Sequence, residues 1–154
     1  TTQAMRASGN ASRRATATPP LHEATAGQTF VAANDTLTEV RVLLAGGART
    51  TNGPVTLRLF ADPPIGAPLA ESTLEGATVT QNRWYGFPID DVAVEKGRLY
   101  SFELSTPAGS ATAANAWYQD SVDNYPDGGR LLNRQPAAGD LYFGVLGFDR
   151  AANR

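Results

Sequence analysis

The chain has 154 residues, a formal net charge of −2, no cysteine and a single histidine, His22. A chain of this length accommodates one domain with a substantial core, and no apolar stretch approaches the roughly 18 residues that a membrane-spanning helix requires. The absence of cysteine excludes disulfides and thiolate chemistry, and the lack of clustered lysine and arginine argues against nucleic-acid binding.

Residues 1–27 are rich in Ala, Thr, Ser, Gly, Arg and Pro and carry a net charge of +2, from three arginines and one glutamate. Little in this segment can be buried, and the run 13–20 is typical of an extended linker. We therefore predict an extended N-terminal arm over 1–27, ahead of a domain over 28–150. Such an arm could lie against its own domain or cross onto a neighbouring subunit.

The domain consists of short segments of alternating apolar and polar residues, separated by turns rich in glycine, proline and asparagine. In the segment 36–45, strict alternation places Val40 and Leu44 on one face and Leu37 on the other. No segment shows the 3.6-residue period of a helix. The predicted strands cover residues 28–33, 36–45, 54–61, 68–72, 77–81, 83–89, 98–105, 112–119 and 140–148.

This succession of strands predicts an all-β fold, a two-sheet antiparallel β-sandwich of eight or nine strands. The connections over 62–67 and 120–139 are long for hairpins and suit strands that cross from one sheet to the other, as in a jelly roll. We therefore expect a jelly-roll-like sandwich over 28–150 that is preceded by the extended N-terminal arm.

Turn and core motifs follow a definite order along the chain, including a Gly-Pro-Val-Thr-Leu strand, a Pro-Leu-Ala segment, a Trp-x-x-Phe strand and a Gly-x-x-Tyr strand entry. The segments that carry this order are 28–30, 37–42, 53–57, 68–70, 84–87, 97–100, 125–128 and 139–141. The order resembles that of secreted bacterial jelly-roll-like β-sandwich accessory modules, many of which are similar in shape to carbohydrate-binding modules. The resemblance covers residues 28–148 and implies secretion and an accessory binding role.

Aromatic side chains are the predicted basis of binding, because sugar rings stack on flat aromatic faces and nearby polar groups bond their hydroxyls. Trp117, Tyr118 and Tyr125 bracket a polar loop that includes Asn124. Neighbours on a strand alternate, so at least one of Trp117 and Tyr118 should face outward. The alternative is that these rings pack in the core at one end of the sandwich.

The second tryptophan, Trp84, belongs to the strand predicted over 83–89. Because Phe87 and Ile89 lie in the same segment, we expect Trp84 to lie inside the sandwich. It is therefore assigned to core packing, where truncation of an aromatic side chain to alanine costs about 3–5 kcal/mol.

The polar loop is also a candidate calcium site. Asp120, Asp123 and Asp127 lie close together in the sequence, and hard carboxylate oxygens suit calcium. Their spacing is not that of an EF-hand. The alternative is a solvated loop in which Asp and Asn side chains bond to their own backbone. We expect no other cofactor.

Catalytic chemistry has little support in the sequence. A Ser-His-Asp arrangement needs a histidine that packing holds in place, and His22 lies in the predicted arm. Asp90 and Asp91 are adjacent, so on a strand they would face opposite ways rather than act as the carboxylate pair of a glycosidase. We therefore predict that the protein is not an enzyme.

The favoured hypothesis is a non-catalytic binding module of a secreted or surface protein that recognises a glycan or another surface ligand. The alternative is a structural subunit of a capsid, fibre or surface assembly, which forms a homo-oligomer by interlocking through the N-terminal arm. Both hypotheses place the protein outside the cell, at the cell surface, or in a virion or fibre. Neither involves nucleic acid or a membrane span.

Overall fold

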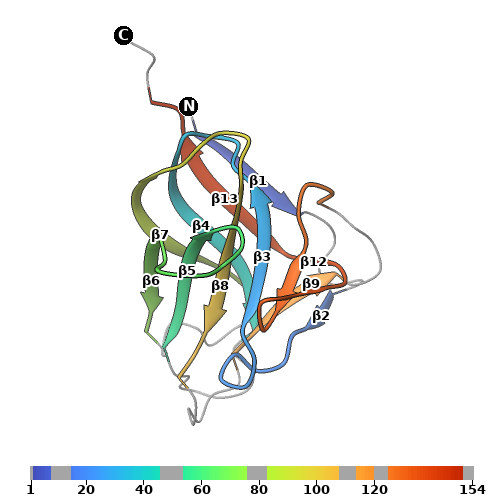
Figure 1. Ribbon diagram of the computed structural model, residues 1–154. Coiled ribbons are helices and arrows are strands. Elements are labelled where there is room, and N and C mark those ends of the chain that lie inside the picture. The colour runs from blue at the N-terminus through green and yellow to red at the C-terminus, as the bar shows by residue number, and fades with distance from the viewer. Residues whose placement is uncertain are drawn as a thin grey trace.

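The structure, a computed structural model, describes residues 2–7, 15–45, 54–75, 83–107, 114–119 and 125–150. Across these ranges the chain forms thirteen β-strands and no helix. The strands make two antiparallel sheets that stack face to face (Figure 1). The prediction of an all-β, two-sheet antiparallel sandwich is confirmed, whereas its jelly-roll-like connectivity stays a prediction.

The first sheet has seven strands. Its order is β1 (Thr2–Ala7), β13 (Phe143–Phe148), β4 (Thr36–Ala45), β9 (Asn115–Gln119) and β12 (Asp140–Leu141), with β2 (Ala15–Ala17) beside β9 and β7 (Arg83–Ala93) beside β4. The second sheet has six strands. Its order is β11 (Gln135–Ala137), β10 (Arg130–Leu132), β3 (Ala26–Val31), β8 (Leu99–Ser105), β5 (Val55–Ala61) and β6 (Ala70–Leu74).

The core lies between the two sheets and is built from the inward-facing residue of each alternating pair. Phe102 of β8 links the layers, because its ring centroid lies 6.2 Å from that of Phe30 in its own sheet and 5.8 Å from that of Phe143 in the other. All three rings are fully buried. In the described part of the chain, no helix has the length and apolar composition that crossing a membrane requires.

Leu37 corrects the prediction from strict alternation. It is buried in the same core cluster as Val40 rather than on the opposite face. The pairing of β4 with β13 skips Thr38, since Glu39 lies opposite Leu146 and Leu37 lies opposite Gly147. This β-bulge inserts one extra residue and shifts the alternation by one position, which turns Leu37 inward.

The N-terminal segment predicted as an arm pairs with the seven-stranded sheet of its own chain. β1 lies antiparallel to β13 and β2 lies antiparallel to β9. Between β2 and β3, Leu21 is buried in the core, and its backbone N donates to the carbonyl O of Ala114 at 2.8 Å. The boundary predicted after residue 27 lies within β3, because this strand covers Ala26–Val31. Backbone pairing needs no apolar side chains, which explains how a segment of this composition joins a sheet.

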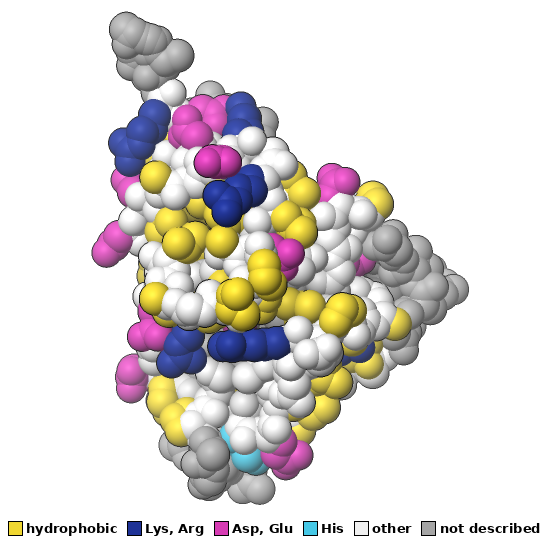
Figure 2. Space-filling model, in the orientation of Figure 1, with side chains coloured by type: hydrophobic (Ala, Val, Ile, Leu, Met, Phe, Trp, Pro, Cys, Tyr) yellow, Lys and Arg dark blue, Asp and Glu magenta, His cyan; other side chains and the backbone are white. Residues whose placement is uncertain are grey.

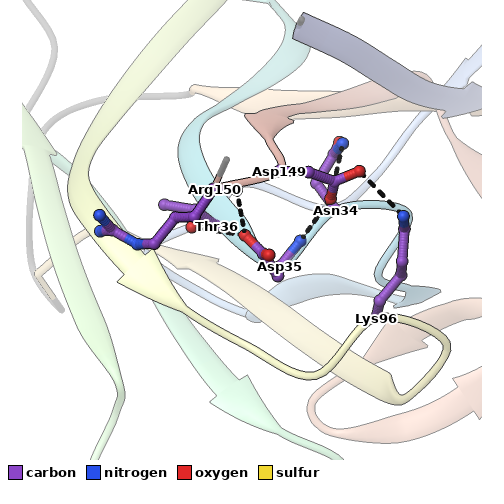
Figure 3. A network of polar contacts seen from close by, with 6 residues as sticks. All are labelled: Asn34, Asp35, Thr36, Lys96, Asp149 and Arg150. Atoms are coloured by element: carbon purple, nitrogen blue, oxygen red, sulfur yellow. Dashed lines mark hydrogen bonds and ion pairs between the residues drawn. The ribbon is translucent and has the colours of Figure 1, made fainter. Parts of the chain in front are cut away.

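Three connections meet in a polar network at one end of the sandwich (Figure 3). Asp149, just after β13, accepts a hydrogen bond from the backbone N of Asp35 at 3.1 Å and pairs with the Lys96 ammonium at 2.9 Å. Asp35 in turn accepts hydrogen bonds from the Thr36 hydroxyl at 2.8 Å and from the backbone N of Arg150 at 3.0 Å. These bonds tie the chain after β13 to the start of β4 and to the turn between β7 and β8.

Candidate functional site

Tyr118 faces inward from β9 and packs against the core. The guanidinium of Arg130 lies over its ring, 3.7 Å from the centroid. This stacking is a cation–π contact within the domain. The ring face that it covers is therefore occupied by the protein itself.

Three contacts fix the position of Tyr125 in the domain. Its hydroxyl accepts a hydrogen bond from the backbone N of Val31 at 2.9 Å, and its ring meets Phe143 edge-on with centroids 5.3 Å apart. Its backbone N donates to Asp140 at 3.1 Å. Burial raises the pKa of the Tyr125 hydroxyl, and the neighbouring carboxylates of Asp127 and Asp140 add to that rise. These contacts join β3, β13 and the segment before β10.

Asp140 is a buried carboxylate that sequence reasoning did not single out as a partner of Tyr125. It is 1% exposed and accepts a hydrogen bond from the Gln28 side-chain amide at 2.9 Å, in addition to the one from Tyr125. The amide oxygen of Gln28 accepts from the backbone N of Leu141 at 2.9 Å. Because buried polar groups must find partners, this set of bonds holds the base of the loop that follows β9.

The predicted calcium loop lies largely outside the described residues, including Asp120, Asp123 and Asn124. Asp127, the remaining predicted ligand, is exposed in a turn. Within the ranges that the structure describes, no three His, Cys, Asp or Glu side chains gather closely enough to hold a metal ion. The calcium site stays a prediction.

Trp117 lies on the opposite face of β9 from its neighbours, because Ala116 and Tyr118 both pack toward the core. Its carbonyl O accepts a hydrogen bond from the backbone N of Tyr142 at 3.1 Å, and the Tyr142 carbonyl accepts one from Leu43 at 3.0 Å. Leu43 belongs to β4, and across the other edge of that strand it lies opposite Trp84 of β7.

Residues that lie opposite each other on paired strands share a face of the sheet. Trp84, Leu43, Tyr142 and Trp117 therefore form one row across the outer face of the seven-stranded sheet, which we call the tryptophan row. Exposure changes sharply along it: Trp84 is 45% exposed, whereas Leu43 is 8% and Tyr142 is 1% exposed. Trp117 has intermediate exposure.

Trp84 corrects the expectation that it lies inside the sandwich. Tyr85, Phe87 and Ile89 fill the inward positions of β7 and are buried. Trp84 is an odd number of residues from each of them, so alternation alone directs it outward. The signal that sequence reasoning missed was this parity, since shared membership of an apolar segment was read as a shared face.

An ion pair lies beside the tryptophan row. The Arg41 Nε donates to Glu39 Oε2 at 2.8 Å, and the Arg41 side chain is 53% exposed. The Glu39 carboxylate lies over Gly86, directly where a side chain at that position would begin. Gly86 faces Arg41, and Pro88 faces Glu39, across the β4–β7 pair. A flat indole and two charged groups are thus presented together on one sheet surface.

His22 lies next to the carboxylate of Glu23, with 3.5 Å between Nε2 and Oε2. Neither residue belongs to the tryptophan row or to the ion pair beside it. The prediction that the protein is not an enzyme stays a prediction.

Comparison with known proteins adds no assignment to this geometry. The chain matches no family model, and the comparison with curated proteins found no match. The candidate site therefore rests on the residues themselves.

Proposed function

We propose that this protein is a non-catalytic binding module that recognises glycan chains on the outer face of its seven-stranded sheet. The observation that carries the proposal is Trp84, a large indole left 45% exposed on a sheet face beside the Arg41–Glu39 pair. An exposed indole presents a flat apolar face to a ligand, and aromatic side chains are enriched at interaction sites.

The chemistry of this surface suits a sugar. The face of a pyranose ring carries C–H groups that stack on an aromatic plane, and its hydroxyls take up hydrogen bonds around the rim. An indole also offers one N–H donor. Arg41 supplies further donors and Glu39 supplies acceptors, and bonds to charged groups are stronger than neutral ones.

The tryptophan row also favours a chain over a single sugar. Trp84 of β7 and Trp117 of β9 lie on the two neighbours of β4, two strand-to-strand steps or about 10 Å apart at ordinary spacing. A ligand that contacts both indoles must therefore be longer than a single sugar ring. Such polymers are found at cell surfaces and outside cells, so we propose the same location for this module.

The in-chain pairing of β1 and β2 favours this proposal over assembly through a free arm. Six residues of β1 are paired with β13, so an arm that interlocked with a neighbour would first have to leave its own sheet. Of the two hypotheses, the binding module needs no such rearrangement.

The proposal is tested with the variants Trp84→Ala and Trp117→Ala on a broad glycan array, followed by calorimetric titration of any glycan that binds. We expect Trp84→Ala to weaken binding at least tenfold, about 1.4 kcal/mol, with a smaller loss for Trp117→Ala. Both variants should keep the melting temperature of the wild type within a few degrees.

The matched control is Ile65→Ala, which removes an exposed apolar side chain from the other sheet and should leave glycan binding unchanged. Absence of binding by the wild type across neutral and acidic glycans would refute the proposal. So would a Trp84→Ala variant that binds as tightly as the wild type.

A further inference from the structure

The Arg41–Glu39 pair beside the tryptophan row leaves part of each charged group unbonded. Arg41 Nε donates to Glu39 Oε2 at 2.8 Å, and within the described residues neither Glu39 Oε1 nor the two terminal nitrogens of Arg41 have a hydrogen-bond partner. Both side chains reach solvent, since even the less exposed of the two, Glu39, is 29% exposed. The pair therefore presents an acceptor and donors next to each other.

Gly86 gives the Glu39 carboxylate its place beside the exposed indole. Glu39 Oε2 lies where the Cβ of any larger residue at position 86 would stand. Trp84 and Gly86 are two residues apart on β7 and share its outer face. At ordinary strand rise, about 7 Å separates the start of the Trp84 side chain from the carboxylate. A sugar ring that stacks on the indole therefore has the charged pair at its edge.

The other charged groups of β7 make this surface acidic. Asp90 is exposed next to the buried Ile89, so it points outward, and Asp91 is exposed as well. Arg83 does not offset them on the outer face, because its guanidinium lies 5.1 Å from the centre of the Tyr85 ring, which packs in the core. Together with the carboxylate of the pair, three acidic groups thus accompany a single guanidinium.

We infer that this surface selects uncharged glycans whose rings carry two adjacent free hydroxyl groups. One hydroxyl donates to Glu39 while its neighbour accepts from Arg41, so the unbonded parts of both side chains are used together. The bond between the two residues holds each in position before the ligand arrives, which lowers the ordering cost of binding. The inference rests on the proposed function, because it names the class of glycan that the same site takes.

A carboxylate or sulfate group on the sugar does not suit this surface. Its negative charge must compete with Glu39 for Arg41, and it approaches the exposed carboxylates of Asp90 and Asp91. Like charges that are brought together at a binding surface disfavour the wrong partner. The surface therefore discriminates against acidic glycans by charge.

The first test compares ligands that differ only in charge. Calorimetric titration of the full chain uses oligosaccharides of glucose, mannose and galactose, each with its counterpart oxidised at the primary alcohol to the uronic acid, which keeps the ring hydroxyls. We expect at least one neutral oligosaccharide to bind, and its oxidised counterpart to bind at least tenfold more weakly. Added salt should narrow this difference, because it screens exposed charges.

The variant Glu39→Gln removes the repelling charge while keeping the size of the side chain. We expect it to weaken binding of the neutral oligosaccharide about fivefold and to reduce the preference over the oxidised one. The matched control is Glu71→Gln, because Glu71 also pairs with an arginine, Arg58, at 2.7 Å. That pair lies on the six-stranded sheet, on the side of the molecule where Figure 2 shows Lys and Arg side chains beside hydrophobic ones. Glu71→Gln should leave both affinities unchanged.

Deoxy analogues of the bound neutral oligosaccharide, each lacking one ring hydroxyl, test the role of the adjacent hydroxyls. The wild type should bind the analogues that lack either member of one adjacent pair about fivefold more weakly. A variant that combines Glu39→Gln with Arg41→Gln should show a smaller difference between these analogues and the parent sugar. If every analogue binds the wild type as tightly as the parent does, the hydroxyls are not bound by the charged pair and the inference is overturned.

The outcomes separate this inference from the proposed function. Oxidised oligosaccharides that bind as tightly as the neutral ones would overturn the inference and leave the glycan-binding proposal intact. A Glu39→Gln variant that keeps the full preference of the wild type would do the same. Absence of binding to every neutral and oxidised oligosaccharide and across the glycan array would refute the proposed function, and the inference with it.

Discussion

At the residue scale, burial gives the Asp140 carboxylate a structural role that its position in the sequence does not indicate. In the sequence it is one more acidic residue near a polar loop. In the structure its two carboxylate oxygens accept from Gln28 and from the backbone of Tyr125. A buried acceptor that is lost leaves its donors unpaired, which costs more than the bond contributed.

We expect Asp140→Asn to destabilise the protein by about 1–3 kcal/mol, because an amide NH₂ would replace one acceptor that faces an existing donor. Urea unfolding followed by circular dichroism measures this change. The matched control is Asp127→Asn, an exposed turn position, which should stay within about 0.5 kcal/mol of wild type. Equal effects of the two substitutions would show that Asp140 does not have the structural role described here.

The Lys96–Asp149 pair has a defined pH dependence. The hydrogen bond that Asp149 accepts from Lys96 lowers the pKa of Asp149, and the bond from the backbone N of Asp35 adds to this effect. The same hydrogen bond raises the pKa of Lys96. A carboxyl group whose pKa is lowered by folding stabilises the fold at pH values above its unfolded-state pKa. This contribution is lost as the pH falls through the folded-state pKa. The ammonium contribution is lost as the pH rises through the raised pKa of Lys96.

We therefore expect Asp149→Asn to lower the melting temperature slightly between about pH 5 and pH 9, the interval in which both groups are charged. The difference from wild type should shrink as the pH falls below about 4 and again at strongly alkaline pH. Differential scanning fluorimetry over this range measures it. A difference that stays constant down to pH 2 would mean that the ion pair is not its source.

At the scale of elements, two glycines mark close approaches that differ in kind. A side chain at Gly147 would meet the backbone carbonyl of Thr36 at the β4 bulge, whereas one at Gly86 would meet the Glu39 carboxylate. Backbone in a paired strand cannot move aside easily, but the end of a flexible side chain can. The same substitution should therefore have different consequences at the two sites.

We expect Gly147→Ala to cost about 1–3 kcal/mol, as overpacking in a well-packed region does. Gly86→Ala should change stability by less than about 1 kcal/mol but displace Glu39 from Arg41, and so reduce glycan binding if the proposed site is correct. Chemical denaturation of both variants provides the comparison. Equal stability losses would contradict the assignment of the two contacts.

The N-terminal segment is the second element whose removal is informative. Deleting residues 1–7 removes β1 and leaves β13 as an exposed edge, which should lower stability modestly and promote aggregation. Deleting residues 1–22 also removes β2 and Leu21, and loss of a buried leucine side chain alone costs about 2–5 kcal/mol. We therefore expect the longer deletion to unfold the domain or nearly so, as measured by thermal melting and light scattering. An unchanged melting temperature after the longer deletion would show that this segment does not support the core.

At the scale of the whole molecule, both sheets share a single core, and strands far apart in sequence are neighbours. β13 lies between β1 and β4, and β3 lies between β8 and β10. Long loops must close before such strand pairs can form their contacts. Folding is therefore slow compared with that of helical domains.

We expect one cooperative unfolding transition, with tryptophan fluorescence and far-ultraviolet circular dichroism giving the same midpoint, and refolding on a millisecond-to-second timescale in stopped-flow measurements. Fluorescence reports the outer face of the seven-stranded sheet, where both tryptophans lie, and circular dichroism reports both sheets. Two separate midpoints would show that the sheets unfold independently and that the core does not couple them.

The sequence by itself determined the all-β class and much of the inward face. Alternation with period two is a local property, so the burial of Val40 and Leu44 follows from position along one strand. The same alternation predicts that Trp84 points outward, because it lies an odd number of residues from Phe87 and Ile89.

Only the tertiary structure decided where that pattern is interrupted and which distant groups meet. The bulge at Thr38 depends on the pairing of β4 with β13, and the partner of the Tyr125 hydroxyl is Val31, 94 residues earlier. The N-terminal segment joins a sheet because β13 and β9 offer unpaired backbone groups to it. Alternation cannot encode these outcomes, because each depends on contacts between segments that are brought together only when the whole chain folds.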